Sequence, residues 1–141
     1  MDVGTKLTDS DFEKLENESW ITREYAELAE LRRVTSQEGA LLVSPQGKGD
    51  YAGIVFPNIW PGETEPREYS LRRDNPEYEV KADGTRKALR KYVNPPGRAN
   101  LAYIPPGTDS ATLKDVAIPV YVTEGPKKAQ ALQRLLTESG K

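Results

Sequence analysis

The pattern of hydrophobic and polar residues divides the chain into three parts. In the first part, residues 1–40, side chains recur at three- and four-residue intervals over positions 25–32, which is typical of an amphipathic helix. Two further pairs have the spacing of a capping box at a helix start: Ser10 with Glu13, and Thr35 with Glu38. The pattern therefore predicts a cap of short helices over residues 1–40.

Residues 41–117 instead have a pattern typical of short strands joined by turns. Residues 53–56 form an apolar run, residues 68–72 alternate polar and apolar side chains, and Pro61-Gly62 between them favours a turn. These features predict two antiparallel strands. A further turn at Asp83-Gly84 and two Pro-Pro-Gly runs predict additional short strands and ordered loops.

The last part, residues 118–141, predicts a strand followed by a helix. Residues 118–122 are almost continuously apolar, as in a strand buried on both faces. Pro126 suits the first position of a helix, which then carries an apolar stripe: Ala129, Leu132, Leu135 and Leu136. We expect one α+β domain with short N-terminal helices, a mainly antiparallel sheet and a C-terminal strand-helix unit.

The composition excludes several classes of chemistry. The chain has 141 residues, enough for one domain, and contains no Cys and no His. This rules out a disulfide framework, a Cys or His nucleophile, a Ser-His-Asp triad and a zinc site of the usual ligand types. No apolar run approaches the roughly 20 residues of a membrane span, and the N-terminal residues lack the pattern of a signal peptide. We expect a cytoplasmic protein without a membrane partner.

The net charge is only -2, but its sign changes along the chain. Residues 1–40 carry 5 basic and 10 acidic residues, whereas residues 67–98 carry 9 basic and 5 acidic ones. The segment from Arg86 to Arg98 contains five cations and no carboxylate, and tyrosines interleave with the basic residues of this region. Single-stranded nucleic acid binds such surfaces, because cations neutralise phosphates and rings stack on bases. The alternative is a solvated strand face with its tyrosines packed inward.

Glu124 is the best single candidate for chemistry. It follows the predicted buried strand, at the strand end where open α/β sheets bind their ligands. Lys127 and Lys128 come next, in a first helical turn where the helix dipole disfavours cations, so either an anionic ligand or a plain surface position would explain them. Asp9 and Asp11 fit a helix cap better than a metal site.

Three motifs, in this order, resemble those of a known family. They are Tyr69–Pro76 (YSLRRDNP), Lys91–Gly97 (KYVNPPG) and Tyr121–Gly125 (YVTEG). The chain is similar to a domain family of unknown function that accompanies phage and plasmid primase–helicase proteins. More distantly, it resembles the N-terminal part of the catalytic core of bacterial replicative primases, which leads into a TOPRIM fold. The resemblance implies a role in the DNA replication of a phage, plasmid or other mobile element.

The resemblance also implies roles for particular residues. Arg72 and Lys91 would contact the template strand or nucleotide phosphates, and Glu124 would be the TOPRIM glutamate beside magnesium. The TOPRIM site needs an additional Asp-x-Asp from a later strand, which does not follow Glu124 here, so we expect no catalysis by this chain alone and no firmly bound magnesium. The predicted nucleic-acid-binding residues are Arg72, Arg73, Arg90, Lys91, Tyr92, Arg98 and Lys128.

The leading hypothesis is therefore the nucleic-acid-binding accessory half of a primase-like protein, which grips single-stranded DNA. The alternative is a protein-interaction module or inactive primase–helicase fragment. In this interpretation the acidic residues 1–40, here called the acidic front, dock on a helicase, polymerase or host factor. A third hypothesis is a working magnesium-dependent primase or nuclease with carboxylates supplied in trans. The sequence leaves open whether the chain is a fragment or a natural short protein.

Overall fold

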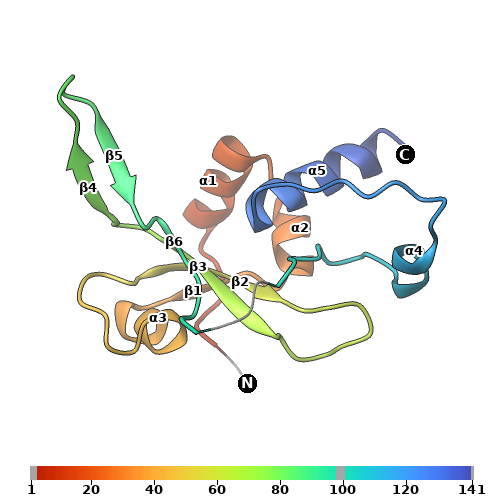
Figure 1. Ribbon diagram of the computed structural model, residues 1–141, viewed down its shortest axis with the longest axis horizontal. Coiled ribbons are helices and arrows are strands. Elements are labelled where there is room, and N and C mark those ends of the chain that lie inside the picture. The colour runs from red at the N-terminus through yellow and green to blue at the C-terminus, as the bar shows by residue number, and fades with distance from the viewer. Residues whose placement is uncertain (1–2, 98–100, 141) are drawn as a thin grey trace.

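The structure, a computed structural model, describes residues 3–97 and 101–140 and confirms the predicted α+β class (Figure 1). The helices are α1 (Asp9–Ser19), α2 (Arg23–Leu28), α3 (Ser36–Val43), α4 (Ser110–Lys114) and α5 (Pro126–Glu138). The strands are β1 (Arg32–Val34), β2 (Gly53–Asn58), β3 (Glu68–Arg73), β4 (Glu77–Val80), β5 (Arg86–Leu89) and β6 (Tyr92–Val93). None of the helices within the described ranges combines the length and the apolarity needed to cross a membrane.

Four strands form an antiparallel sheet in the order β1-β2-β3-β6. β2 and β3 pair over six residues, from Gly53 opposite Arg73 to Asn58 opposite Glu68, which confirms the predicted strand pair. Gly53 is required where it stands, because a Cβ atom there would lie 2.0 Å from the carbonyl oxygen of Arg72. The close approach of these two strands therefore depends on a residue without a side chain.

β1 lies within the segment that the sequence pattern assigns to helices alone. The helical spacing extends to Arg32, but α2 ends at Leu28 because Glu30 adopts a left-handed backbone conformation with φ 55°. Arg32 is instead the first residue of β1, which pairs with β2. The predicted cap of helices thus also supplies one edge of the sheet.

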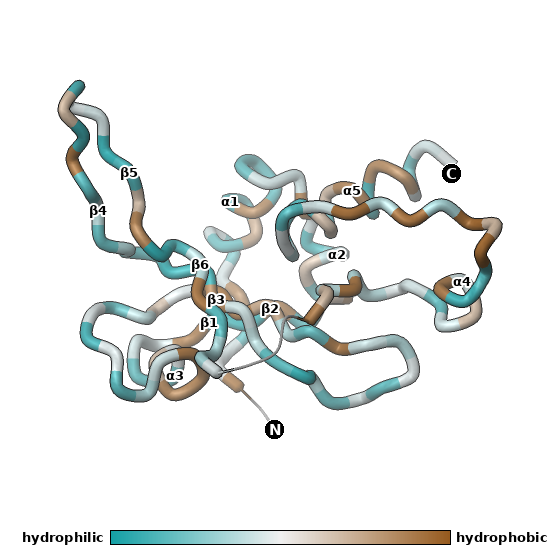
Figure 2. The backbone as a smooth tube through the Cα atoms, viewed as in Figure 1, coloured by the Kyte–Doolittle hydropathy of each residue, from teal (hydrophilic) through white to brown (hydrophobic). Residues whose placement is uncertain are grey.

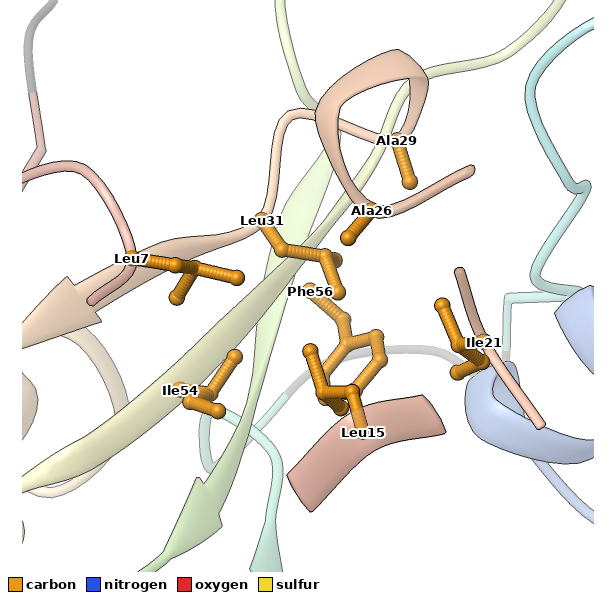
Figure 3. Packing of buried hydrophobic residues seen from close by; sticks show 8 residues of the cluster. All are labelled: Leu7, Leu15, Ile21, Ala26, Ala29, Leu31, Ile54 and Phe56. Carbon is orange, nitrogen blue, oxygen red and sulfur yellow. The ribbon is translucent and has the colours of Figure 1, made fainter. Parts of the chain in front are cut away.

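The sheet separates two hydrophobic clusters. On one face α1 and α2 pack on β2, and Figure 3 shows the buried side chains between them: Leu7, Leu15, Ile21, Ala26, Ala29, Leu31, Ile54 and Phe56. On the other face α3 covers the sheet through a second cluster: Val34, Val43, Tyr51, Val55, Leu71 and Val93. Successive residues of a strand point to opposite faces, so β2 contributes to both clusters.

Threonine residues cap the helices on both faces. The predicted capping box of Thr35 with Glu38 is confirmed at the start of α3. At α1 the box consists of Thr8 and Asp11, so the predicted pair of Ser10 with Glu13 is wrong. Ser10 lies inside α1, because Thr8 has the extended backbone of an N-cap. Asp11 therefore belongs to a cap, as the sequence favours.

Arg33 of β1 joins three parts of the fold. Its guanidinium donates hydrogen bonds to Asp11 of α1, with Nε and Oδ2 2.7 Å apart, and to Asp74 after β3, with Nη1 and Oδ2 2.6 Å apart. Burial acts to raise the pKa of Asp11, but the hydrogen bonds from Arg33 and Thr8 outweigh it and lower that pKa to about 2. The ion pairs of Arg33 thus clamp the start of α1 to the sheet.

β4 and β5 form a separate two-stranded hairpin that projects from the body on the same side of the sheet as α1 and α5 (Figure 1). Its tip contains the predicted turn at Asp83-Gly84, and Gly84 has the positive φ of 84° that such turns require. At its base, Arg73 donates two hydrogen bonds to Glu77, and its backbone N–H donates to the carbonyl of Lys91. The hairpin is therefore anchored at the end of β3.

The predicted strand over residues 118–122 is wrong. This segment pairs with no strand within the described residues, and its side chains are exposed, with Val120 at 76% and Val122 at 90%. Figure 2 shows its apolar character along the outer connection between α4 and α5. A strand buried on both faces needs neighbours reached through crossovers, and the described chain places none beside it. The helix expected next is confirmed, with Pro126 in its first turn.

We predict that Asp11→Asn lowers the free energy of unfolding at pH 7 by about 2 kcal/mol, because the folded-state pKa of Asp11 lies well below the unfolded value of 3.8. With the folded pKa depressed, this contribution is present above the unfolded pKa and is lost as the pH falls toward the folded value of about 2. Urea unfolding of both proteins at pH 7 and at about pH 3 measures the difference.

Asp9→Asn is the matched control for this prediction. The side chain of Asp9 is 95% exposed although it contacts Arg23, so its substitution should change the stability by less than about 0.5 kcal/mol. Equal losses in the two variants would contradict the clamp.

Candidate functional site

The candidate site is a cluster of cations where α1, β3, β6 and the start of α5 meet. Arg72 of β3 pairs with Ile54 of β2 and with Tyr92 of β6 in the sheet register. Residues paired across strands share a face, and Ile54 belongs to the cluster beneath α1, so Arg72 and Tyr92 face α1 as well. The predicted binding residues Arg72 and Tyr92 are thus brought together.

Arg72 is a buried cation that the protein only partly satisfies. Its side chain is 5% exposed, and Nη2 lies 3.4 Å from Oε2 of Glu18, near the end of α1. Its Nε is fully buried and has no hydrogen-bond partner within the described part of the chain. An unpaired buried donor costs roughly 1–3 kcal/mol, so one that a protein retains calls for an explanation such as a ligand.

Lys91 lies in the same cation-rich surroundings. Burial lowers the pKa of its ammonium, and the charges of Arg72, Lys127 and Lys14 lower it further, while only Glu18 among the neighbours with the strongest effects raises it. The repulsion among these cations is not compensated by a matching number of carboxylates. A bound anion would compensate it.

The N-terminus of α5 adds to the positive potential. Lys127 lies in the first turn of α5, and its Nζ is 5.8 Å from the centre of the Tyr92 ring. Among the residues that the structure describes, no side chain caps this end of α5, so the helix dipole and the N–H groups of the first turn remain available. In Figure 1 the start of α5 lies beside α1, on the same side of the sheet. The helix dipole and the lysine side chain therefore both favour an anionic ligand.

We call this set of residues, Arg72, Lys91, Lys127 and Lys14 with Glu18, the Arg72 cluster. It combines a buried guanidinium, lysines and a helix N-terminus, which together fit a phosphate group. Glu18 supplies the carboxylate that pairs with Nη2 of Arg72, and its side chain is 53% exposed. Glu18 is thus free to swing aside when a phosphate takes its place.

Arg73, the next residue, has a different environment from Arg72. Its guanidinium is 1% exposed and donates to both oxygens of Glu77, at 2.6 and 2.9 Å, and from Nε to the carbonyl of Asp50 at 2.7 Å. It also lies over the ring of Tyr51. These contacts use its donors to hold the hairpin and the β2 segment together, so the structure gives Arg73 a structural role.

The remaining predicted residues lie apart from the Arg72 cluster or outside its contacts. Arg90 is exposed and has a left-handed backbone (φ 50°) between β5 and Lys91. Lys128 is exposed and forms an ion pair with Glu124. Arg98 lies outside the described residues. Lys91 and Tyr92 are thus the predicted residues that accompany Arg72.

Glu124 does not form a magnesium site with the residues around it. Its side chain is 83% exposed, and its hydrogen bond with Lys128 lowers the pKa of the carboxyl. Among the described residues, no three carboxylates gather where they could hold a metal ion, Glu124 included. Magnesium prefers several oxygen ligands, so one carboxylate paired with a lysine does not suit it.

Two members of the cluster come from the acidic front, where the sequence gives no sign of them. Lys14 and Glu18 are four residues apart and therefore lie on one face of α1. Only the packing of α1 on the sheet brings Glu18 to Arg72 and the charge of Lys14 near Lys91. Lys127 has a signal in the sequence, because a cation in a first helical turn is disfavoured unless something anionic lies near.

Similarity to known proteins does not assign a family. Comparison of the chain with protein-family models, with curated proteins and with solved structures gives no match. What the Arg72 cluster binds is therefore inferred from its charge, burial and geometry.

We predict that the pKa of Lys91 responds in opposite directions to two neutral substitutions. Lys127→Gln removes a repelling cation and should raise that pKa, whereas Glu18→Gln removes the attracting carboxylate and should lower it further. Titration of ¹³C-dimethylated lysine side chains by NMR measures both changes. Lys87→Gln, on the exposed hairpin, should leave the pKa of Lys91 unchanged. Shifts of the same sign in the first two variants would contradict the cluster.

Proposed function

We propose that this chain is a nucleic-acid-binding module that grips single-stranded DNA by its phosphates at the Arg72 cluster. The observation that carries the proposal is the buried Arg72 guanidinium, whose Nε lacks a partner within the described residues, with the charge of Lys91 close enough to interact with it. Lys91 in turn is repelled by Lys127. Once Glu18 swings aside, a phosphate that enters can accept from Nε and Nη2 of one guanidinium edge, which is the geometry that arginine favours. Lysine ammonium groups then neutralise the same or the adjacent phosphate.

The tyrosine of the site favours a single strand over a duplex. Tyr92 is 39% exposed and its ring lies beside Lys127, so a ring and a cation are presented together. An exposed ring stacks on an unpaired base, whereas the bases of a duplex are already stacked on one another. Phosphate contact at Arg72 and base contact at Tyr92 therefore suit consecutive parts of one strand.

The resemblance in sequence supports a place for this module in replication. Arg72 and Lys91, which the resemblance to primases assigns to template or nucleotide phosphates, are the two residues that the fold brings into one cluster. We propose the accessory, strand-holding half of a primase-like protein of a phage or other mobile element. Glu124 has no part in catalysis by this chain alone under this proposal.

The proposal predicts that Lys91→Gln with Lys127→Gln weakens the binding of labelled single-stranded DNA at least tenfold. Loss of two phosphate contacts should also reduce the slope of log K against log salt by about 1.4, since each contact on a single strand contributes about 0.7. Fluorescence anisotropy at several salt concentrations measures both quantities.

The matched control removes two lysines that are exposed elsewhere, Lys48→Gln with Lys114→Gln, and should change the affinity less than about threefold. If both double variants lose the same affinity, binding depends on net charge and not on the cluster. Thermal unfolding verifies that each variant is folded.

A second prediction is a gain of affinity for DNA, which loss of folding cannot produce. Glu18→Gln should raise the affinity for single-stranded DNA several-fold, because the carboxylate no longer competes with phosphate for Arg72. Glu16→Gln is the control, since Glu16 lies near Arg134 at 3.9 Å and not at the cluster, and it should leave the affinity within about twofold. Equal gains in both variants would show a general effect of acidity and contradict competition at Arg72.

One observation favours a second function, self-association through residues 116–122. Val116, Val120 and Val122 are among the most exposed large hydrophobic side chains of the described residues, although the pattern over residues 118–122 is typical of a buried strand. A protein that fails to bind DNA but sediments as a dimer, and as a monomer with Val120→Glu, would support this function over the first.

A further inference from the structure

The β4–β5 hairpin carries an exposed surface that the Arg72 cluster does not use. Its register places four side chains on one face, here called the Tyr78 face: Tyr78, Val80, Arg86 and Ala88. None of these four is acidic, and Tyr78 is 48% exposed. The other face carries Glu77 opposite Leu89 and Glu79 opposite Lys87, so it has two carboxylates and one cation. The two faces of one small sheet therefore differ sharply in the ligand they suit.

The Tyr78 face combines a ring with a cation. The guanidinium of Arg86 lies over the ring of Tyr78, 4.4 Å from its centre. A guanidinium stacked on a ring offers a second flat surface on which a base can stack, and its edges donate to phosphate. A two-stranded hairpin is marginally stable on its own, and cross-strand pairs such as Tyr78 with Ala88 and Val80 with Arg86 contribute modestly to its stability. These pairs still leave Tyr78 and Val80 exposed, and the ring of Tyr78 is therefore open to a binding partner.

The hairpin is continuous with the Arg72 cluster. β5 is followed directly by Arg90 and then by Lys91, a member of the cluster. The hairpin projects on the same side of the sheet as α1 and α5, which flank the cluster (Figure 1). β4 has four residues and rises about 13 Å. A strand held at Arg72 therefore needs only a few more nucleotides to run along the hairpin.

We propose that the Tyr78 face is a second contact for the same single strand of nucleic acid, a few nucleotides from the phosphate held at the Arg72 cluster. This inference rests on the proposed function. Single-stranded nucleic acid fits the face better than an acidic or apolar protein surface, because the face offers a stacking ring and a cation together and leads into a cluster of phosphate-binding groups. The hairpin thus extends the binding site and lengthens the strand that the protein protects.

Neighbouring residues on the two faces provide a matched test. Arg86→Ala and Lys87→Ala each remove one exposed cation, but only Arg86 lies on the Tyr78 face. With oligothymidine of about 12 nucleotides, Arg86→Ala should weaken binding about tenfold and reduce the salt slope by about 0.7, whereas Lys87→Ala should weaken it less than twofold.

Tyr78→Ala should also weaken binding, and Tyr78→Phe, which keeps the ring, should not. With oligothymidine of about 4 nucleotides, held at the cluster alone, Arg86→Ala should have no effect.

The outcomes separate this inference from the proposed function. Equal losses in Arg86→Ala and Lys87→Ala would overturn the hairpin contact, while a loss in Lys91→Gln with Lys127→Gln would still support binding at the Arg72 cluster. Absence of binding by the unsubstituted protein would overturn both. Unchanged DNA affinity in Arg86→Ala and Tyr78→Ala, together with altered sedimentation, would assign the face to a protein partner and overturn the inference.

Discussion

The α1 side of the molecule depends on one constraint, the fixed position of α1 over β3. Arg33 holds the start of α1 through Asp11 and ties it to Asp74 at the end of β3. Leu15, one turn further along, is buried in the cluster on β2. The last turn of α1 consequently carries Glu18 to within 3.4 Å of Arg72. The acidic front is thus part of the core and of the site, so it cannot be removed without loss of both.

The distribution of carboxylates decides which arginine remains available. Arg72 and Arg73 are adjacent, both are buried, and they point to opposite faces of β3. Arg73 meets both oxygens of Glu77 and a backbone carbonyl, and it serves to anchor the hairpin. Arg72 lies 3.4 Å from one oxygen of an exposed glutamate. Lys91 adds positive charge near Arg72 and is itself repelled by Lys127. A buried cation with so few partners destabilises the folded protein, and a bound anion would offset that cost.

The sequence predicted correctly those elements of the fold that local residue patterns determine. The β2–β3 pair, the Asp83-Gly84 turn, the cap at Thr35 and the helix beginning at Pro126 all follow from short-range periodicity and turn chemistry. β1 was missed because a three-residue edge strand has too little pattern to outweigh the helical spacing around it. The strand over residues 118–122 was wrong because its burial depends on neighbours that the described chain does not provide. In the site, Arg72, Lys91 and Tyr92 follow from their motifs. Glu18 reaches Arg72, and Lys14 comes near Lys91, only through tertiary packing.

The central claim is that the unpaired Nε–H group of Arg72 donates a hydrogen bond to a phosphate oxygen. NMR of the arginine Nε–Hε groups tests this claim most directly. During titration with a short single-stranded oligonucleotide, the Arg72 resonance should shift downfield and its exchange with solvent should slow as the hydrogen bond forms. The Arg73 resonance serves as the internal reference, because its Nε already donates to Asp50 and should not move. Binding that leaves the Arg72 resonance in place, or that moves both resonances equally, would contradict the account.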